Sequence, residues 1–181
     1  MMILFKLIFI HLTILSCAIA EWMETSVSLV LNETTINEAF FLYSDLTKQP
    51  SWSPWITSVE ILDKSTGLSK WKLKKLGLTY SWLAKNIECV NINKHMNVLS
   101  ICWESIDGLP NRGHAEFYVD NVNNNMMKLT VSYKLPVIAS FVIKRLGLYA
   151  ERFIENMLLQ DLIRFNKKLI ENKNNITCKK E

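Results

Sequence analysis

Histidine and cysteine are scarce in this sequence: the 181 residues include three histidines and four cysteines. No CxxC, HExxH or paired-histidine spacing occurs, so no metal site is expected. Glycine is also scarce, and its five positions form no phosphate-binding loop, so no cofactor is expected. The 21 basic residues are scattered among 17 acidic ones without a long basic run, which argues against a DNA- or RNA-binding protein.

Candidate catalytic groups are equally few. His95 falls in a polar stretch that is typical of a solvated hairpin turn. His114 alternates with Ala115 and Phe117, so its side chain is expected on the opposite, outer face of its strand. Glu88 lies on the same alternating face of its predicted strand as Trp82 and Ala84, which would point its carboxylate into the apolar interior. A solvated position at the rim of the sheet is the simpler interpretation. We therefore assign no catalytic residue.

The composition is that of a folded globular protein, with 49% hydrophobic and 21% charged residues. The length fits one domain rather than two. We expect a signal peptide over residues 1–20, a folded domain over residues 21–172 and a polar C-terminal tail over residues 173–181.

The first twenty residues carry one charged side chain, Lys6, then an apolar run that ends in Ala18-Ile19-Ala20, an A-x-A cleavage pattern. This pattern predicts a secretory signal peptide. Two alternatives stay open: an uncleaved membrane anchor, and a bacterial lipoprotein signal with Cys17 as the lipidated residue. In a eukaryotic secretory pathway, Asn32 and Asn175 would begin N-glycosylation sequons, although a chain rich in asparagine also forms sequons by chance.

Three cysteines follow the predicted cleavage site, namely Cys89, Cys102 and Cys178. If the strands that carry Cys89 and Cys102 are joined around residues 91–97, Cys102 falls opposite about residue 85. The offset from Cys89 is then several residues at about 3.3 Å each, which exceeds the reach of a disulfide. We therefore expect no disulfide.

The central part of the chain alternates between apolar and polar residues, which predicts β-strands. Residues 23–31 form the first such segment, and Thr34 or Thr35 together with Glu38 predicts a capping box for a helix over about residues 36–46. Further strands are expected at about 57–63, 68–76, 78–89, 97–106, 113–120 and 126–134. The short turns between successive strands imply an antiparallel meander.

The C-terminal part changes to a helical period. After Pro136, apolar residues recur every three to five positions from Ile138 to Leu169, which predicts one long amphipathic helix of up to about 35 residues, bent at Gly147. The expected fold class is α+β, with a curved antiparallel sheet of seven strands around this helix. A cavity between sheet and helix would be a natural ligand site.

Several short sequence motifs occur along the chain in a defined order and spacing. They are Trp52-Ser53-Pro54-Trp55, Ser81-Trp82-x-Ala84, Ile101-x-Trp103-x-Ser105-x-x-Gly108-x-Pro110-Asn111-x-Gly113, Phe117, Tyr133-x-x-Pro136 and Asp161-Leu162-x-x-Phe165. Together with the element order they resemble the START-like superfamily, and more narrowly the polyketide cyclase/dehydrase and lipid-transport family with its coenzyme-Q-binding proteins. The resemblance covers about residues 24–171 and looks most like the cyanobacterial and plastid-type branch.

The resemblance implies the helix-grip fold and a cavity under the long helix that binds lipids, sterols, quinones or aromatic polyketides. Together with the predicted signal peptide, the likeness to the plastid-type branch leaves two expected destinations: secretion, or a plastid reached through the endoplasmic reticulum. Because fold alone does not decide between binding and catalysis, whether the protein is an enzyme stays open, with binding alone the favoured answer.

The candidate ligand-binding set consists of large apolar and aromatic side chains. Most of them fall at the alternating apolar positions of the predicted strands or on the apolar stripe of the predicted helix. The set is Trp52, Trp55, Trp71, Tyr80, Trp82, Trp103, Phe117, Tyr133, Tyr149, Phe153 and Met157. For each of them, simple core packing is the alternative. Prolines flanking the first two tryptophans predict a tight turn at the cavity mouth, whose rings either touch a membrane or pack as a closed lid.

Three functions are compatible with these patterns. The first is binding, with possible transport, of a lipid or other hydrophobic small molecule such as an isoprenoid, quinone or sterol-like compound. The second is a cyclase or dehydratase that acts on a bound aromatic or isoprenoid substrate, and the third is an exported interaction domain with a packed core. For the favoured first function we expect a hydrophobic small-molecule ligand, transient membrane contact, no nucleic acid and a monomeric protein.

Overall fold

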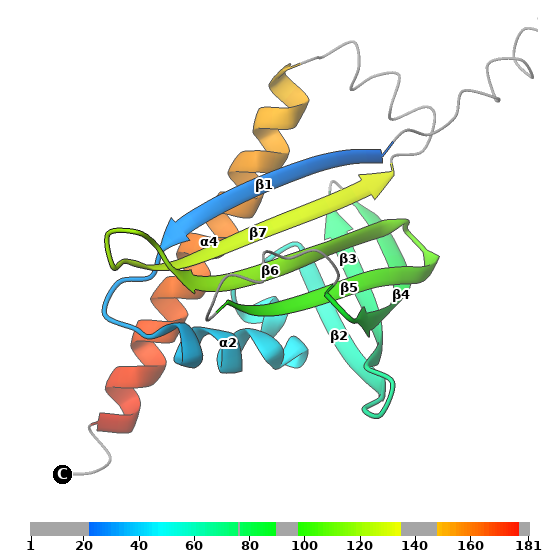
Figure 1. Cartoon of the computed structure of the whole chain (residues 1–181). Helices are drawn as coiled ribbons and strands as arrows, with labels where there is room; N and C mark the ends of the chain where they lie inside the picture. Colours follow the sequence, from blue (N-terminus) through cyan, green and yellow to red (C-terminus); the bar gives the residue numbers. More distant parts are fainter. Residues whose placement is uncertain (1–21, 76, 90–97, 135–147, 178–181) are drawn as a thin grey trace, which may run out of the picture.

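A computed structural model describes residues 22–75, 77–89, 98–134 and 148–177, in which a curved antiparallel sheet is packed against helices (Figure 1). The elements are β1 (Trp22–Val30), α2 (Ile36–Ser44), the 3₁₀ helix η1 (Leu46–Ser51), β2 (Ile56–Asp63), β3 (Leu68–Lys75), β4 (Leu78–Ile87), β5 (Leu99–Gly108), β6 (Asn111–Val119), β7 (Asn125–Lys134) and α4 (Leu148–Thr177). The seven strands lie in the order β1-β7-β6-β5-β4-β3-β2. The predicted α+β architecture is confirmed.

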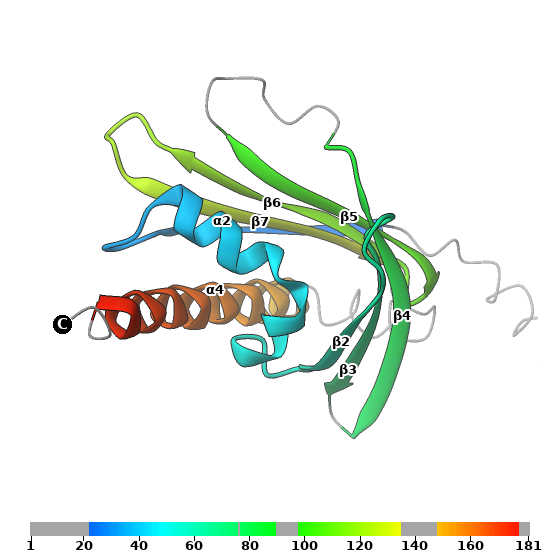
Figure 2. The same cartoon turned by 90° about the horizontal axis from the view of Figure 1, so that it is seen from below.

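The sheet has one apolar face because its strands alternate. On β7, Met127 and Leu129 are buried and pair across the ladder with the inward residues Phe117 and Ala115 of β6. Figure 2 shows α2 and α4 on the same side of the sheet, with β2, β3 and β4 bending toward α4. The helices therefore cover the concave face, and the sheet encloses space at the end where it bends.

The first helix begins with the predicted capping box. The Thr35 hydroxyl accepts a hydrogen bond from the Glu38 backbone N–H at 3.2 Å, and the Glu38 carboxylate accepts one from the Thr35 N–H at 2.8 Å. These two bonds satisfy backbone donors that would otherwise lack partners at the helix start. Helix α2 ends at Ser44, two residues earlier than predicted, because η1 follows it directly.

Helix α4 runs along the sheet and buries a stripe at helical spacing. Leu158, Leu162, Phe165 and Leu169 are each at most 5% exposed, and they join one core cluster with the inner residues of β1, β6 and β7. The helix continues to Thr177, so the start of the predicted tail belongs to it. The predicted helical segment between Pro136 and Gly147 lies outside the described residues. No helix within the described ranges is long and apolar enough to span a bilayer.

The prediction of no disulfide is wrong: Cys89 and Cys102 are bonded, with 5.4 Å between their Cα atoms. The register pairs Cys102 with Ile87 instead of with residue 85, after a shift between Leu83 and Ala84. Strand β4 ends at Ile87, so Cys89 is not held in an extended continuation of the strand. The assumption of a regular ladder up to Cys89 caused the error.

Candidate functional site

A pocket of about 270 Å³ lies between the bent part of the sheet and the helices. Its wall is formed by the inward side chains of β3, β4, β5 and β7, by η1 and the turn that follows it, and by one face of α4. The lining is overwhelmingly apolar, and tryptophan is its most prominent residue type. Within the described ranges no group of histidine, cysteine and carboxylate side chains is arranged to hold a metal ion.

Two stacked tryptophans form the wall on β3 and β4. The ladder places Trp71 opposite Trp82, and their rings stack with centroids 5.7 Å apart and planes 16° apart. The indole N–H of Trp71 donates to the Ser69 hydroxyl at 2.9 Å, and that hydroxyl donates to the Ala84 carbonyl at 3.3 Å. Because the indole N–H of Trp71 is bonded internally, this ring offers a ligand its carbon surface.

Trp103 forms the neighbouring wall on β5. Its indole N–H donates to the Asn111 side-chain oxygen at 3.3 Å, and the Asn111 amide donates to the Leu109 carbonyl at 2.8 Å. Asn111 is buried, so both bonds are made away from bulk water, where an unpaired polar group would be costly. Trp103 is consequently held in one orientation on the pocket wall.

A buried carboxylate on α4 closes one side of the pocket. Asp161 is 3% exposed and accepts hydrogen bonds from the Ser53 hydroxyl at 2.7 Å, from the Trp55 indole N–H, and from Arg164 at 3.1 Å. Burial raises the pKa of Asp161, and the hydrogen bonds from Ser53 and Trp55 and the charge of Arg164 oppose that rise. The carboxylate thereby ties the turn after η1 to the helix.

An aromatic cluster lies behind this turn. Trp52 is 1% exposed, and its ring lies 5.1 Å from Phe165 and 6.1 Å from Tyr43, measured between centroids. Burial is also the main cause that raises the pKa of Tyr43. Of the two alternatives for this turn, exposed rings or a closed lid, the packed one holds for Trp52, while Trp55 is half-buried on the pocket wall.

Seven of the eleven predicted binding residues line the pocket: Trp52, Trp55, Trp71, Trp82, Trp103, Tyr133 and Met157. Three others lie elsewhere. Phe117 is fully buried in the core against Phe40 and Tyr43, and Tyr80 and Phe153 are 39% and 57% exposed. The side chain of Tyr149 lies outside the described part of the structure. Parity predicted the face of Phe117 correctly, but not that α2 covers that part of the sheet.

Asp161 and Asn111, two buried polar residues of the pocket, were not among the predicted binding residues. Asp161 carries a signal that could have found it, because it follows Leu158 by three positions and precedes Leu162 and Phe165 within the apolar stripe of α4. A carboxylate in such a stripe must be paired or hydrogen-bonded when buried. Asn111 carries no comparable signal, because polar residues at strand starts are common.

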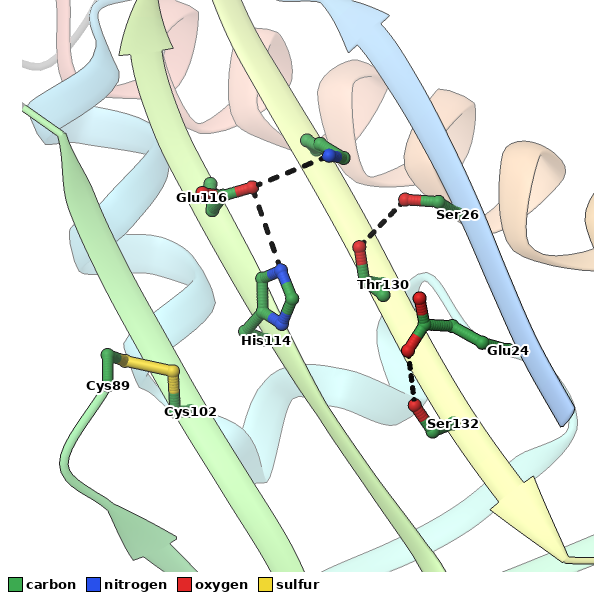
Figure 3. Close-up of polar contacts among 9 residues, drawn as sticks. Glu24, Ser26, Cys89, Cys102, His114, Glu116, Thr130 and Ser132 are labelled. Carbon is green, nitrogen blue, oxygen red and sulfur yellow. Dashed lines mark hydrogen bonds and ion pairs between the residues drawn. A yellow bond between two sulfur atoms is a disulfide. The ribbon is translucent and has the colours of Figure 1, made fainter. Parts of the chain in front are cut away.

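The outer face of the sheet is polar, and Figure 3 shows it turned away from α4. His114 lies there as predicted, with its Nε2 atom 3.7 Å from the Glu116 carboxylate, which also lies 3.9 Å from Lys128. Glu88 is exposed just past the end of β4, in agreement with a rim position. His95 lies outside the described residues. None of the described groups on this face lines the pocket.

Residues 33–158 match the family model described as polyketide cyclase / dehydrase and lipid transport. No curated protein sequence matches the chain. Among solved structures, the TTHA0849 protein of Thermus thermophilus has a TM-score of 0.65 at 15% identity, and the alignment covers 83% of this chain and 99% of that one.

Two further structures are similar over nearly their whole length. The Zhui aromatase/cyclase of Streptomyces sp. R1128 has a TM-score of 0.58 at 13% identity, with 82% of this chain and 93% of that one covered. A START superfamily protein of Mycobacterium smegmatis has a TM-score of 0.58 at 11% identity, with 83% and 97% covered. At these identities the likeness shows a shared helix-grip fold.

Proposed function

Because the chain belongs to the polyketide cyclase / dehydrase and lipid transport family, we propose that it binds a lipid or other hydrophobic small molecule between the sheet and α4. An isoprenoid, quinone or sterol-like compound is the expected class, and transport of that compound is the expected purpose. The observation that carries the proposal is a pocket of about 270 Å³ walled by tryptophan rings. A pocket of this kind is a typical small-molecule site.

The hydrogen bonding of the wall supports recognition by apolar contact. The indole N–H groups of Trp55, Trp71 and Trp103 are all engaged with polar side chains of the protein. These three rings present π-surface rather than donors, which favours a ligand with flat or conjugated parts over one recognised by hydrogen bonds. The volume also favours a compact molecule over a two-chain phospholipid.

The alternative of cyclisation or dehydration would require a proton donor or acceptor in the pocket. Within the described residues, Asp161 is the carboxyl group that lines it. Its oxygens accept hydrogen bonds from Ser53, Trp55 and Arg164. We therefore assign Asp161 the role of holding the turn after η1 in place, rather than that of a proton donor or acceptor. We therefore keep catalysis as the second function and binding without chemistry as the first.

We also propose that the protein is exported and acts outside the reducing cytosol. The expected signal peptide over residues 1–20 and the disulfide between Cys89 and Cys102 both support export, since such bonds persist in oxidising compartments. Export predicts that the purified protein begins at Glu21, which intact mass measurement checks. An N-terminus at Met1 would contradict cleavage.

The binding proposal is tested by filling the pocket. Ala84 is 2% exposed and lines the pocket, whereas Ser81, on the same strand, faces outward and is exposed. We expect A84F to weaken the quenching of tryptophan fluorescence by an isoprenoid quinone by roughly tenfold or more, and S81F to leave it unchanged. Chemical denaturation of both variants controls for unfolding. Equal quenching by the two folded variants would contradict a ligand site here.

A further inference from the structure

A row of lysines lies on the outer face of the strand whose inner face lines the pocket. On β3 the residues Lys70, Lys72 and Lys74 alternate with Trp71 and Leu73. The two apolar residues line the pocket, so the three lysines project from the opposite face, and neighbours in the row are about 6.6 Å apart along the strand. We call these three residues the lysine row.

The positive charge of the lysine row is largely uncompensated. Among the described residues, no carboxylate comes within ion-pair distance of any of its three ammonium groups. Glu60 is the acidic residue paired with Lys70 across the β2 ladder, whereas Lys72 lies between Ser58 and Ser81. Like charges at this spacing repel one another, and an anionic surface would relieve that repulsion.

The end of the row lies near the point where β3 joins β4. Lys72 and Lys74 are exposed, and Lys74 is the last residue but one of β3. Figure 2 shows the joined ends of β3 and β4 at the periphery of the molecule. Exposed lysine side chains at the periphery of a protein are suited to contact the anionic headgroups of a bilayer.

We propose that the lysine row docks the protein on a bilayer that contains anionic lipids. The row extends over about 13 Å, so it spans several headgroups rather than a single phosphate ion. Docking there would bring the tryptophan-walled pocket, on the other side of the same strand, close to an apolar phase. The inference rests on the proposed ligand-binding function for its purpose, but the docking itself needs no pocket ligand.

The test is flotation of the purified protein with vesicles of phosphatidylcholine alone or mixed with phosphatidylserine. We expect binding to the mixed vesicles only, and weaker binding at higher salt. Each lysine near an anionic surface raises the membrane-binding constant about fivefold, so K70Q/K72Q/K74Q should lower that constant by about a hundredfold. A matched variant, K48Q/K167Q/K168Q, removes the same charge from η1 and α4 and should leave binding nearly unchanged.

Each other outcome overturns the proposal. Absence of binding to mixed vesicles, or equal loss in the two triple variants, would show that the row is not a membrane surface. Retention of short single-stranded RNA by the wild-type protein, without vesicle binding, would assign the row to a nucleic acid instead. The A84F variant separates the two proposals, because it should still float with mixed vesicles although its pocket is filled.

Discussion

The indole ring of Trp103 lies over Gly113, its partner across the β5–β6 ladder, and occupies the space that a side chain at position 113 would need. A Cβ atom on Gly113 would lie 2.6 Å from Cζ2 of Trp103 and 2.3 Å from the Thr130 carbonyl oxygen. Both separations are shorter than any real contact. Because Gly113 has no side chain, the Trp103 ring can lie flat on the pocket wall.

This relationship predicts that Gly113→Ala destabilises the protein and disturbs the pocket together. Overpacking of this kind costs about 1–3 kcal/mol, measured as the free energy of unfolding in denaturant. The double variant W103A/G113A should cost less than the sum of the single changes, because removing the ring removes one of the two clashes. Strict additivity would show that Trp103 and Gly113 are not coupled.

Trp103 and Phe165 are expected to respond differently to truncation. Phe165 is fully buried among Tyr43 and Trp52, so Phe165→Ala should cost about 3–5 kcal/mol of unfolding free energy. Trp103 faces the pocket on one side, so Trp103→Ala should cost less than about 3 kcal/mol of unfolding free energy. It should weaken ligand binding more strongly than Phe165→Ala does. The reverse order of the two unfolding energies would mean that Trp103 is core rather than wall.

Asp161 should give the protein an unusual pH dependence. Its pKa in the folded state is raised mainly by burial, so the folded protein holds this proton more tightly than the unfolded chain does. The stability that Asp161 contributes is therefore greatest at low pH and falls as the pH rises from about 4 through the raised pKa. The carboxylates of Glu38, Asp45 and Asp120 have lowered pKa values and act in the opposite direction.

The variant Asp161→Asn isolates this contribution, because the other carboxylates are common to both proteins. We expect the unfolding free energy of the wild type relative to D161N to decrease as the pH rises from about 3 to 7. The measurement is denaturant unfolding across that range. A difference that stays constant, or grows with pH, would contradict the raised pKa of Asp161.

The disulfide closes the connection between β4 and β5, both of which carry walls of the pocket. Its loop of 13 residues predicts a loss of about 3 kcal/mol of unfolding free energy on reduction or in C89S/C102S. A thiol assay on the denatured protein should show two additional thiols per chain after reduction. An unchanged thiol count would mean that Cys89 and Cys102 are not bonded.

The regular parts of the fold could be predicted from the sequence, because local patterns determine them. Alternation fixed the strands and their inward faces, and Thr35 with Glu38 marked the start of α2. The Cys89–Cys102 bond could not be predicted, since it depends on a register shift at Leu83 and on where β4 ends. Both features arise from tertiary packing rather than from local pattern.

The candidate site was predicted in part for the same reason. Parity identified the tryptophans of the wall, but parity does not say which part of a sheet face a helix covers. Phe117 consequently lies under α2 in the core, while Tyr80 and Phe153 lie in solvent-exposed positions. The hydrogen-bond partners that orient the rings, such as Ser69 and Asn111, are set by cross-strand register.

The most direct test of the account is native mass spectrometry of the protein purified from a lipid-containing host, followed by organic extraction. The account predicts a monomer mass with one hydrophobic compound bound at close to one per chain, and its loss in A84F but not in S81F. A clean unliganded mass, together with no uptake from a mixed lipid and quinone extract, would contradict the binding of a hydrophobic molecule in this pocket.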